Sequence, residues 1–146
     1  MGLVAENVRE EHLTLFKTGR TNANDGGIDF VMRPLGRFFQ VTETVDVGKY
    51  FLDIDKIQRF PLTFVVKSND SVSGIEVAIK TQAKARYKIE AVVAGYMQAI
   101  EEIINIPRLL DCLKTVIAAN GIKRVMDEIV TQSKVEFNDR SDVDNE

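Results

Sequence analysis

The sequence has little of several residue types on which common functions depend. Among its 146 residues there is one cysteine, Cys112, and one histidine, His12. A single cysteine excludes an internal disulfide framework and any zinc site made of several cysteines, and a single histidine excludes sites built from several imidazoles. No apolar run approaches the ~18 residues of a transmembrane helix, and the acidic start is unlike a signal peptide. We therefore expect an intracellular, cytoplasmic protein without a transmembrane segment, with peripheral membrane contact left open.

No motif for catalysis or cofactor binding is recognisable. Cys112 lies among leucines in a predicted helix, where a free cysteine behaves as a small buried hydrophobe, and His12 is expected at the surface. The two are distant in the sequence, so a nucleophile–base pair would need a coincidence of the fold. The acids Asp53 and Asp55 have no ligand cluster around them, and no glycine-rich phosphate loop is present. The sequence thus predicts a protein that is not an enzyme, with no cofactor and no metal.

The charge is unevenly placed along the chain. The formal net charge is −3, and residues 135–146 hold five acids and one base, which leaves the rest of the chain at +1. An acidic end that is poor in apolar residues is typical of a disordered, solvated tail. We expect one domain over residues 1–134, β-rich over 12–89 and helical over 90–132, followed by a disordered acidic tail over 135–146.

Alternating polarity in the first half of the chain predicts strands. Between residues 38 and 47, Phe39 and Val41 fall on one parity, and Gln40 and Thr42 fall on the other. Because successive side chains of a strand point to opposite faces, we expect the apolar parity to be buried and the polar parity to face water.

A long β-hairpin is predicted over residues 62–68 and 73–89, with its turn at Asn69-Asp70. Apolar residues hold the odd positions of the second arm and charged residues the even ones. The resulting basic face comprises Lys67, Lys80, Lys84, Arg86 and Lys88. Such a face could follow nucleic acid or anionic lipid, but exposed aromatic residues that would stack on bases are missing from it. Lysines that keep a strand soluble are therefore the favoured interpretation.

The period of the apolar pattern changes to that of a helix near Ile89. Three helices are predicted, over residues 89–104, from Pro107 to about Ala119, and over 122–130. Leu113 and Ile117 lie one turn apart on the second of these and are expected in the core. Strands followed by helices predict an α+β fold, a mainly antiparallel sheet with a C-terminal three-helix segment packed on it.

Short motifs over residues 13–130 resemble the stomatin/prohibitin/flotillin (SPFH) superfamily domain. They are Gly19-Arg20 with the stretch Gly27–Pro34, the turn Asn69-Asp70-Ser71-Val72, the strand end Arg86-Tyr87-Lys88-Ile89, and the helix Leu113-Lys114-Thr115-Val116-Ile117. Asp29 stands where the family usually has histidine, and neither a membrane anchor nor a long coiled coil is evident. The resemblance implies a bare scaffold domain, with membrane attachment and ring assembly in doubt.

We accordingly expect a non-catalytic scaffold or assembly module that acts through protein–protein contacts and oligomerises, with itself or another protein as the partner. One alternative is a small structural or accessory protein of a virus or phage. A second alternative is a nucleic-acid-binding protein that uses the basic face, although nucleic acid and anionic lipid are the less favoured partners.

Overall fold

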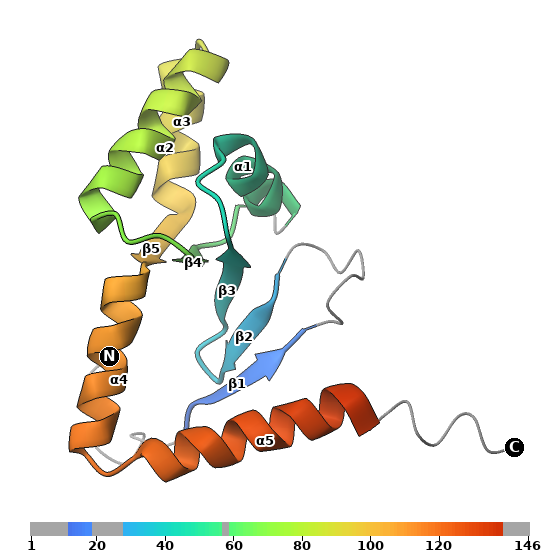
Figure 1. The fold of residues 1–146 in the computed structure, drawn as a ribbon. Coiled ribbons are helices and arrows are strands. Elements are labelled where there is room, and N and C mark those ends of the chain that lie inside the picture. Colours follow the sequence, from blue (N-terminus) through green and yellow to red (C-terminus); the bar gives the residue numbers. More distant parts are fainter. Residues whose placement is uncertain (1–11, 19–27, 57–58, 139–146) are drawn as a thin grey trace, which may run out of the picture.

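The computed structural model describes residues 12–18, 28–56 and 59–138, which form five strands and five helices (Figure 1). The strands are β1 (Thr14–Lys17), β2 (Phe30–Arg33), β3 (Arg37–Thr42), β4 (Leu62–Val66) and β5 (Ile100–Ile104). The helices are α1 (Val47–Lys56), α2 (Val72–Arg86), α3 (Glu90–Ala99), α4 (Ile106–Ala118) and α5 (Ile122–Asn138). The predicted α+β class, with an N-terminal sheet and C-terminal helices, is confirmed.

The five strands form one mixed sheet in the order β1-β2-β3-β4-β5. The first three pair antiparallel, whereas β4 runs parallel to both β3 and β5. Parallel neighbours need crossover connections, and α1 supplies the first while α2 and α3 supply the second. The antiparallel sheet that the sequence predicts is therefore limited to β1–β3.

The hydrophobic core lies between one face of the sheet and the helices α1, α2 and α3 (Figure 1). Leu62, Phe64 and Val66 project into it from alternate positions of β4. Helix α1 contributes Tyr50, whose ring meets the Phe64 ring edge-on with centroids 4.2 Å apart. Stacking of Phe51 on Tyr96, with centroids 4.1 Å apart, joins α1 to α3.

The second arm of the predicted hairpin is wrong, because residues 72–86 form helix α2. Ser71 caps this helix, its hydroxyl oxygen accepting a hydrogen bond from the Gly74 amide at 3.1 Å. The buried residues Ile75, Ile79 and Ala83 recur every four positions, the spacing of one helix face. All three are also odd-numbered, so the same residues satisfied the alternation from which a strand was predicted.

The helix predicted over residues 89–104 is too long. Helix α3 ends at Ala99, and Ile100–Ile104 form β5 at the edge of the sheet. Backbone pairing with β4 aligns Phe64 with Ile103 and Val65 with Ile104. Isoleucine is β-branched and fits a pleated surface better than a helix, which explains the change of structure within one apolar run.

The two faces of strand β3 are the reverse of those predicted. The polar residues that were expected to face water lie on the core side. Gln40 is 7% exposed and Thr42 2% exposed, whereas Val41 between them is 46% exposed. Thr42 meets its hydrogen-bonding needs locally, since its hydroxyl donates to the Thr44 carbonyl at 3.1 Å. The Oε1 atom of Gln40 has no hydrogen-bond partner among the described residues. The apolar parity of β3 thus faces away from the core.

Candidate functional site

The basic face predicted from the sequence does not form, because helix α2 distributes its residues over several surfaces. Lys67 follows β4 and pairs with Glu43 at 3.2 Å. Arg86 ends α2, with its guanidinium 5.8 Å from the centre of the Tyr87 ring, and Lys88 is exposed in the link to α3. Only Lys80 and Lys84 stay together, one helical turn apart.

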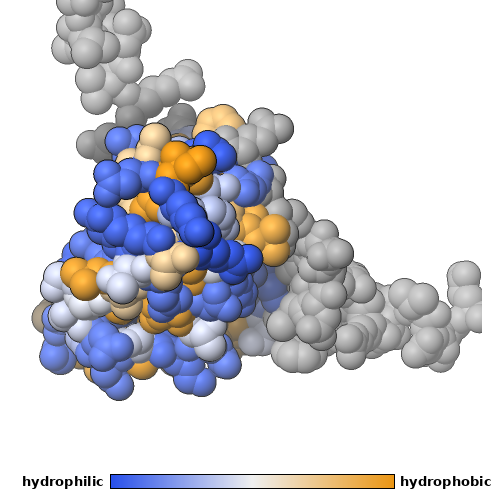
Figure 2. All heavy atoms as spheres, turned by 90° about the horizontal axis from the view of Figure 1, so that it is seen from above, coloured by the Kyte–Doolittle hydropathy of each residue, from blue (hydrophilic) through white to orange (hydrophobic). Residues whose placement is uncertain are grey.

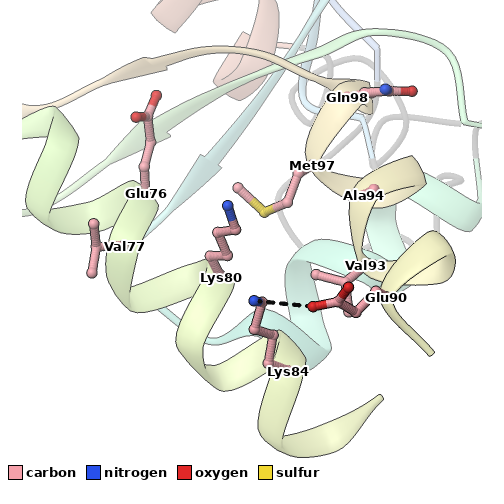
Figure 3. A pocket seen from close by; sticks show the side chains of 9 residues that line it. All are labelled: Glu76, Val77, Lys80, Lys84, Glu90, Val93, Ala94, Met97 and Gln98. Atoms are coloured by element: carbon pink, nitrogen blue, oxygen red, sulfur yellow. Dashed lines mark hydrogen bonds and ion pairs between the residues drawn. The ribbon is translucent and has the colours of Figure 1, made fainter. Parts of the chain in front are cut away.

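Lys80 and Lys84 line a groove of about 570 Å³ between α2 and α3 (Figure 3). The Lys84 ammonium pairs with Glu90 across the groove at 3.4 Å, and the end of the Lys80 side chain points toward Met97. Glu76 also lines the groove, so the two ammonium groups of the groove are matched by two carboxylates. Seen from the end where these helices project, the surface is mostly hydrophilic with scattered hydrophobic residues (Figure 2). The groove therefore has no excess of positive charge for a phosphate backbone.

A stronger candidate is the pair of helices α4 and α5, residues 106–138, which we call the arm. It leaves the edge of the sheet directly after β5, and α5 begins at the far end of α4 and runs away from it, below β1 in the view of Figure 1. No described side chain of either helix is buried. The prediction that the C-terminal helices pack on the sheet is therefore wrong for α4 and α5. Helix α5 continues to Asn138, four residues into the segment predicted to be a disordered tail.

Each helix of the arm carries an exposed apolar stripe. Eight large apolar side chains are 39–54% exposed, namely Leu109, Leu110, Leu113, Ile117, Ile122, Met126, Ile129 and Val130. The prediction that Leu113 and Ile117 lie in the core is therefore wrong, and Cys112, expected to be buried, is exposed. Periodicity correctly identified the stripes, but it reports only that a face is apolar and not which surface covers it.

The start of the arm is held by a set of hydrogen bonds around Asn105. The Asn105 side-chain amide donates to the Asp70 carbonyl oxygen at 2.7 Å, and its Oδ1 accepts from the Arg108 amide at 3.0 Å. The Ile106 amide donates to the Ser68 carbonyl oxygen at 3.0 Å. Pro107 lies in the first turn of α4, as predicted, where its missing N–H leaves no bond unmade. These contacts fix the direction in which α4 leaves the body.

The corner between α4 and α5 is equally well defined. Asn120 takes the left-handed conformation that commonly follows the end of a helix, with φ of 55°. The Gly121 amide donates to the Val116 carbonyl oxygen at 2.8 Å. A Cβ atom at Gly121 would lie 3.1 Å from the side chain of Val116, so the close approach favours glycine there.

The face of the sheet opposite the core is also apolar, and we call it the open face. Strand register places Leu15 beside Met32, Met32 beside Arg37, and Val41 beside Val65 on this face. None of these apolar residues belongs to the core cluster, and Val41 and Leu15 are among the exposed large hydrophobic residues. Arg37 crosses the open face to contact Glu102 at 2.5 Å and Glu101 at 3.2 Å.

Sites of other kinds are not evident in the described ranges. There, no cluster of three or more histidine, cysteine, aspartate or glutamate residues could hold a metal ion. No described helix has the length and apolarity of a membrane span. His12 is exposed, as the sequence predicted. Comparisons of the chain with protein families, with curated proteins and with solved structures gave no match.

Proposed function

We propose that this protein is a non-catalytic assembly module that associates with itself through the arm. The observation that carries the proposal is the exposure of both apolar stripes, on α4 and on α5, in a chain that has a well-packed core elsewhere. Large exposed apolar patches are uncommon on monomeric proteins and commonly bind another protein.

The energetics of the arm favour burial against a partner. Apolar surface that leaves water contributes about 25 cal/mol per Å², and eight half-exposed side chains along two helices provide such surface. Inside the isolated chain this free energy is gained only in part, because the stripe side chains stay about half exposed. A partner surface would supply it on association.

Charge on the arm does not oppose self-association. On α4, Lys114 pairs with Asp111 at 3.1 Å, and on α5, Lys123 pairs with Asp127 at 2.7 Å. These pairs are within one helix, so the charges beside the stripes are largely balanced before any partner arrives. Two copies of the arm can therefore approach without strong repulsion.

The resemblance to the SPFH domain agrees with an assembly function and stays a prediction. One part of it differs from the structure, since Asn69–Val72 leads into helix α2 instead of a long strand. A structural protein of a virus or phage would use the arm in the same way. The alternative of nucleic-acid binding is no longer supported, because the basic residues assigned to it do not share a face.

Light scattering coupled to size exclusion tests the proposal. The unaltered chain is expected to elute as a dimer or larger species, and Leu113→Asp or Met126→Asp to elute as a monomer with unchanged circular dichroism. Val77→Asp is the matched control, because Val77 is exposed on α2, away from the arm. A monomeric unaltered chain, or equal masses for all four proteins, would contradict the proposal.

A further inference from the structure

We infer that the surface covering the arm is the open face of a second copy of this chain. The inference rests on the proposed function and names the partner of the same arm. One chain carries two partly exposed apolar surfaces, a helical one on α4 and α5 and a flat one on the sheet. A helix stripe packed on a sheet face is one of the common layer arrangements of protein domains, so each surface fits the other.

The open face has the composition of a surface that becomes buried. Phe39, Val41 and Val65 lie on β3 and β4, and Met32 and Leu15 extend the patch over β2 and β1. Its central cation, Arg37, is already paired with two carboxylates and donates to the hydroxyl of the buried Thr63 at 3.1 Å. Covering this face would therefore leave no unpaired guanidinium behind.

The dimensions of the two surfaces agree. The 17 residues of α5 make a helix of about 25 Å at 1.5 Å per residue. The five strands, spaced about 4.8 Å apart, give a sheet about 19 Å wide. Helix α5 can thus cross the full width of the open face and place its stripe over β1 to β4.

A second copy is favoured over the chain's own sheet because both ends of α4 are held. Asn105 ties the start of α4 to Asp70, and the close contact of Gly121 with Val116 sets the corner before α5. To close on its own open face, the arm would have to break these contacts. In a two-fold dimer each arm covers the other copy's sheet, so the same pair of surfaces is used twice, as an isologous interface requires. Specific complexes typically bury ~1,600 Å² in total, and in a two-fold dimer two copies of the contact contribute to that area.

Site-directed cross-linking tests the inference. The protein would carry Val41→Cys and Met126→Cys together with Cys112→Ser, so that one cysteine lies on the open face and one on the stripe of α5. Its control carries Val77→Cys in place of Val41→Cys, because Val77 is also an exposed valine but lies on α2. After mild oxidation we expect most of the first protein to run as a covalent dimer joined between positions 41 and 126, and the control to show only background cross-linking.

The other outcomes are distinct. A dimer in solution without the 41–126 disulfide would overturn the inference and leave the proposed function standing, with the arms pairing to each other or to another surface. A disulfide within one chain would show that the arm folds onto its own sheet and would also overturn the inference. A monomer before oxidation would overturn the proposed function itself.

Discussion

The side chain of Asn105 donates a hydrogen bond to the backbone carbonyl of Asp70, with 2.7 Å between nitrogen and oxygen. The two residues are 35 positions apart, and the contact joins the start of the arm to the loop before α2. Because the same side chain caps α4 through the Arg108 amide, one asparagine both begins the helix and sets its direction. Asn105 is buried, so neither bond is exposed to competition from bulk water.

Replacing Asn105 separates these two roles. Asn105→Ala removes the cap and leaves the Asp70 carbonyl without its donor, so we expect the free energy of unfolding to fall by about 1–3 kcal/mol. Asn105→Ser restores a capping oxygen but is too short to reach Asp70, and should recover about half of that loss. Urea denaturation measures both. An alanine variant as stable as the unaltered chain would show that Asn105 does not hold the arm.

A pair of substitutions in α2 distinguishes the helix from the strand predicted by alternation. In a strand, Val77 and Ile79 would share a buried face, whereas in α2 Ile79 is fully buried and Val77 is 64% exposed. Ile79→Ala is expected to lower the free energy of unfolding by about 2–5 kcal/mol, and Val77→Ala by less than about 0.5 kcal/mol. Equal losses in chemical denaturation would contradict the helix.

Alkaline pH should destabilise the protein through Tyr50. Burial raises the pKa of Tyr50 to about 12, from the ordinary 10.0. Between these values the unfolded chain ionises first, so the contribution to stability is complete below pH 10 and is lost as the pH rises through 12. The loss from this group amounts to about 2–3 kcal/mol.

Tyr50→Phe provides the test. The Tyr50 hydroxyl has no hydrogen-bond partner among the described residues, so its removal breaks no bond. The variant should be at least as stable as the unaltered chain at pH 8, because a buried hydroxyl without a partner is removed, and should decline less between pH 10 and 12. The hydrogen bond to Asp55 raises the pKa of Tyr96 in the same direction, and this contribution stays in both proteins. Parallel declines in denaturation free energy across that range would refute the assignment to Tyr50.

We expect the buried amide of Gln40 to lower the stability of the protein. Its unpartnered Oε1 atom is shielded from water and its neighbour across the sheet is Phe64, so Gln40→Leu removes a desolvation cost. We expect the variant to gain about 0.5–2 kcal/mol in thermal or chemical unfolding. Thr42→Val is the contrasting change, since it breaks the bonds to Thr44 and should lose about 1 kcal/mol. A clear loss for Gln40→Leu would show that the amide is engaged.

Local signals in the sequence predicted part of this structure correctly. Pro107 marked the start of α4. Alternation failed over residues 73–89 because Ile75, Ile79 and Ala83 satisfy both a period of two and a spacing of four. Ser71 as a helix cap, and the alanines and lysines that follow it, were the signals that could have decided for a helix.

The two proposed interaction surfaces could not have been found from periodicity. An apolar stripe on a helix looks the same in the sequence whether its own chain or a second chain covers it, and Leu113 was assigned to the core for that reason. In β3 the alternation was real, but the apolar side was assumed to be the core side. Gln40 was therefore predicted to be exposed and Val41 to be buried, and the structure shows the reverse. Which face is covered depends on contacts between distant parts of the chain, and only the fold supplies those.

Sedimentation equilibrium of the unaltered chain, over a hundredfold range of concentration, tests the central claim most directly. The chain mass is 16.4 kDa. The account predicts a mass twice that value or more at high concentration, which falls toward the monomer on dilution and does not change between low and high salt, because the stripes are apolar. A mass that stays at the monomer value throughout, with the apolar stripes in water, would contradict it.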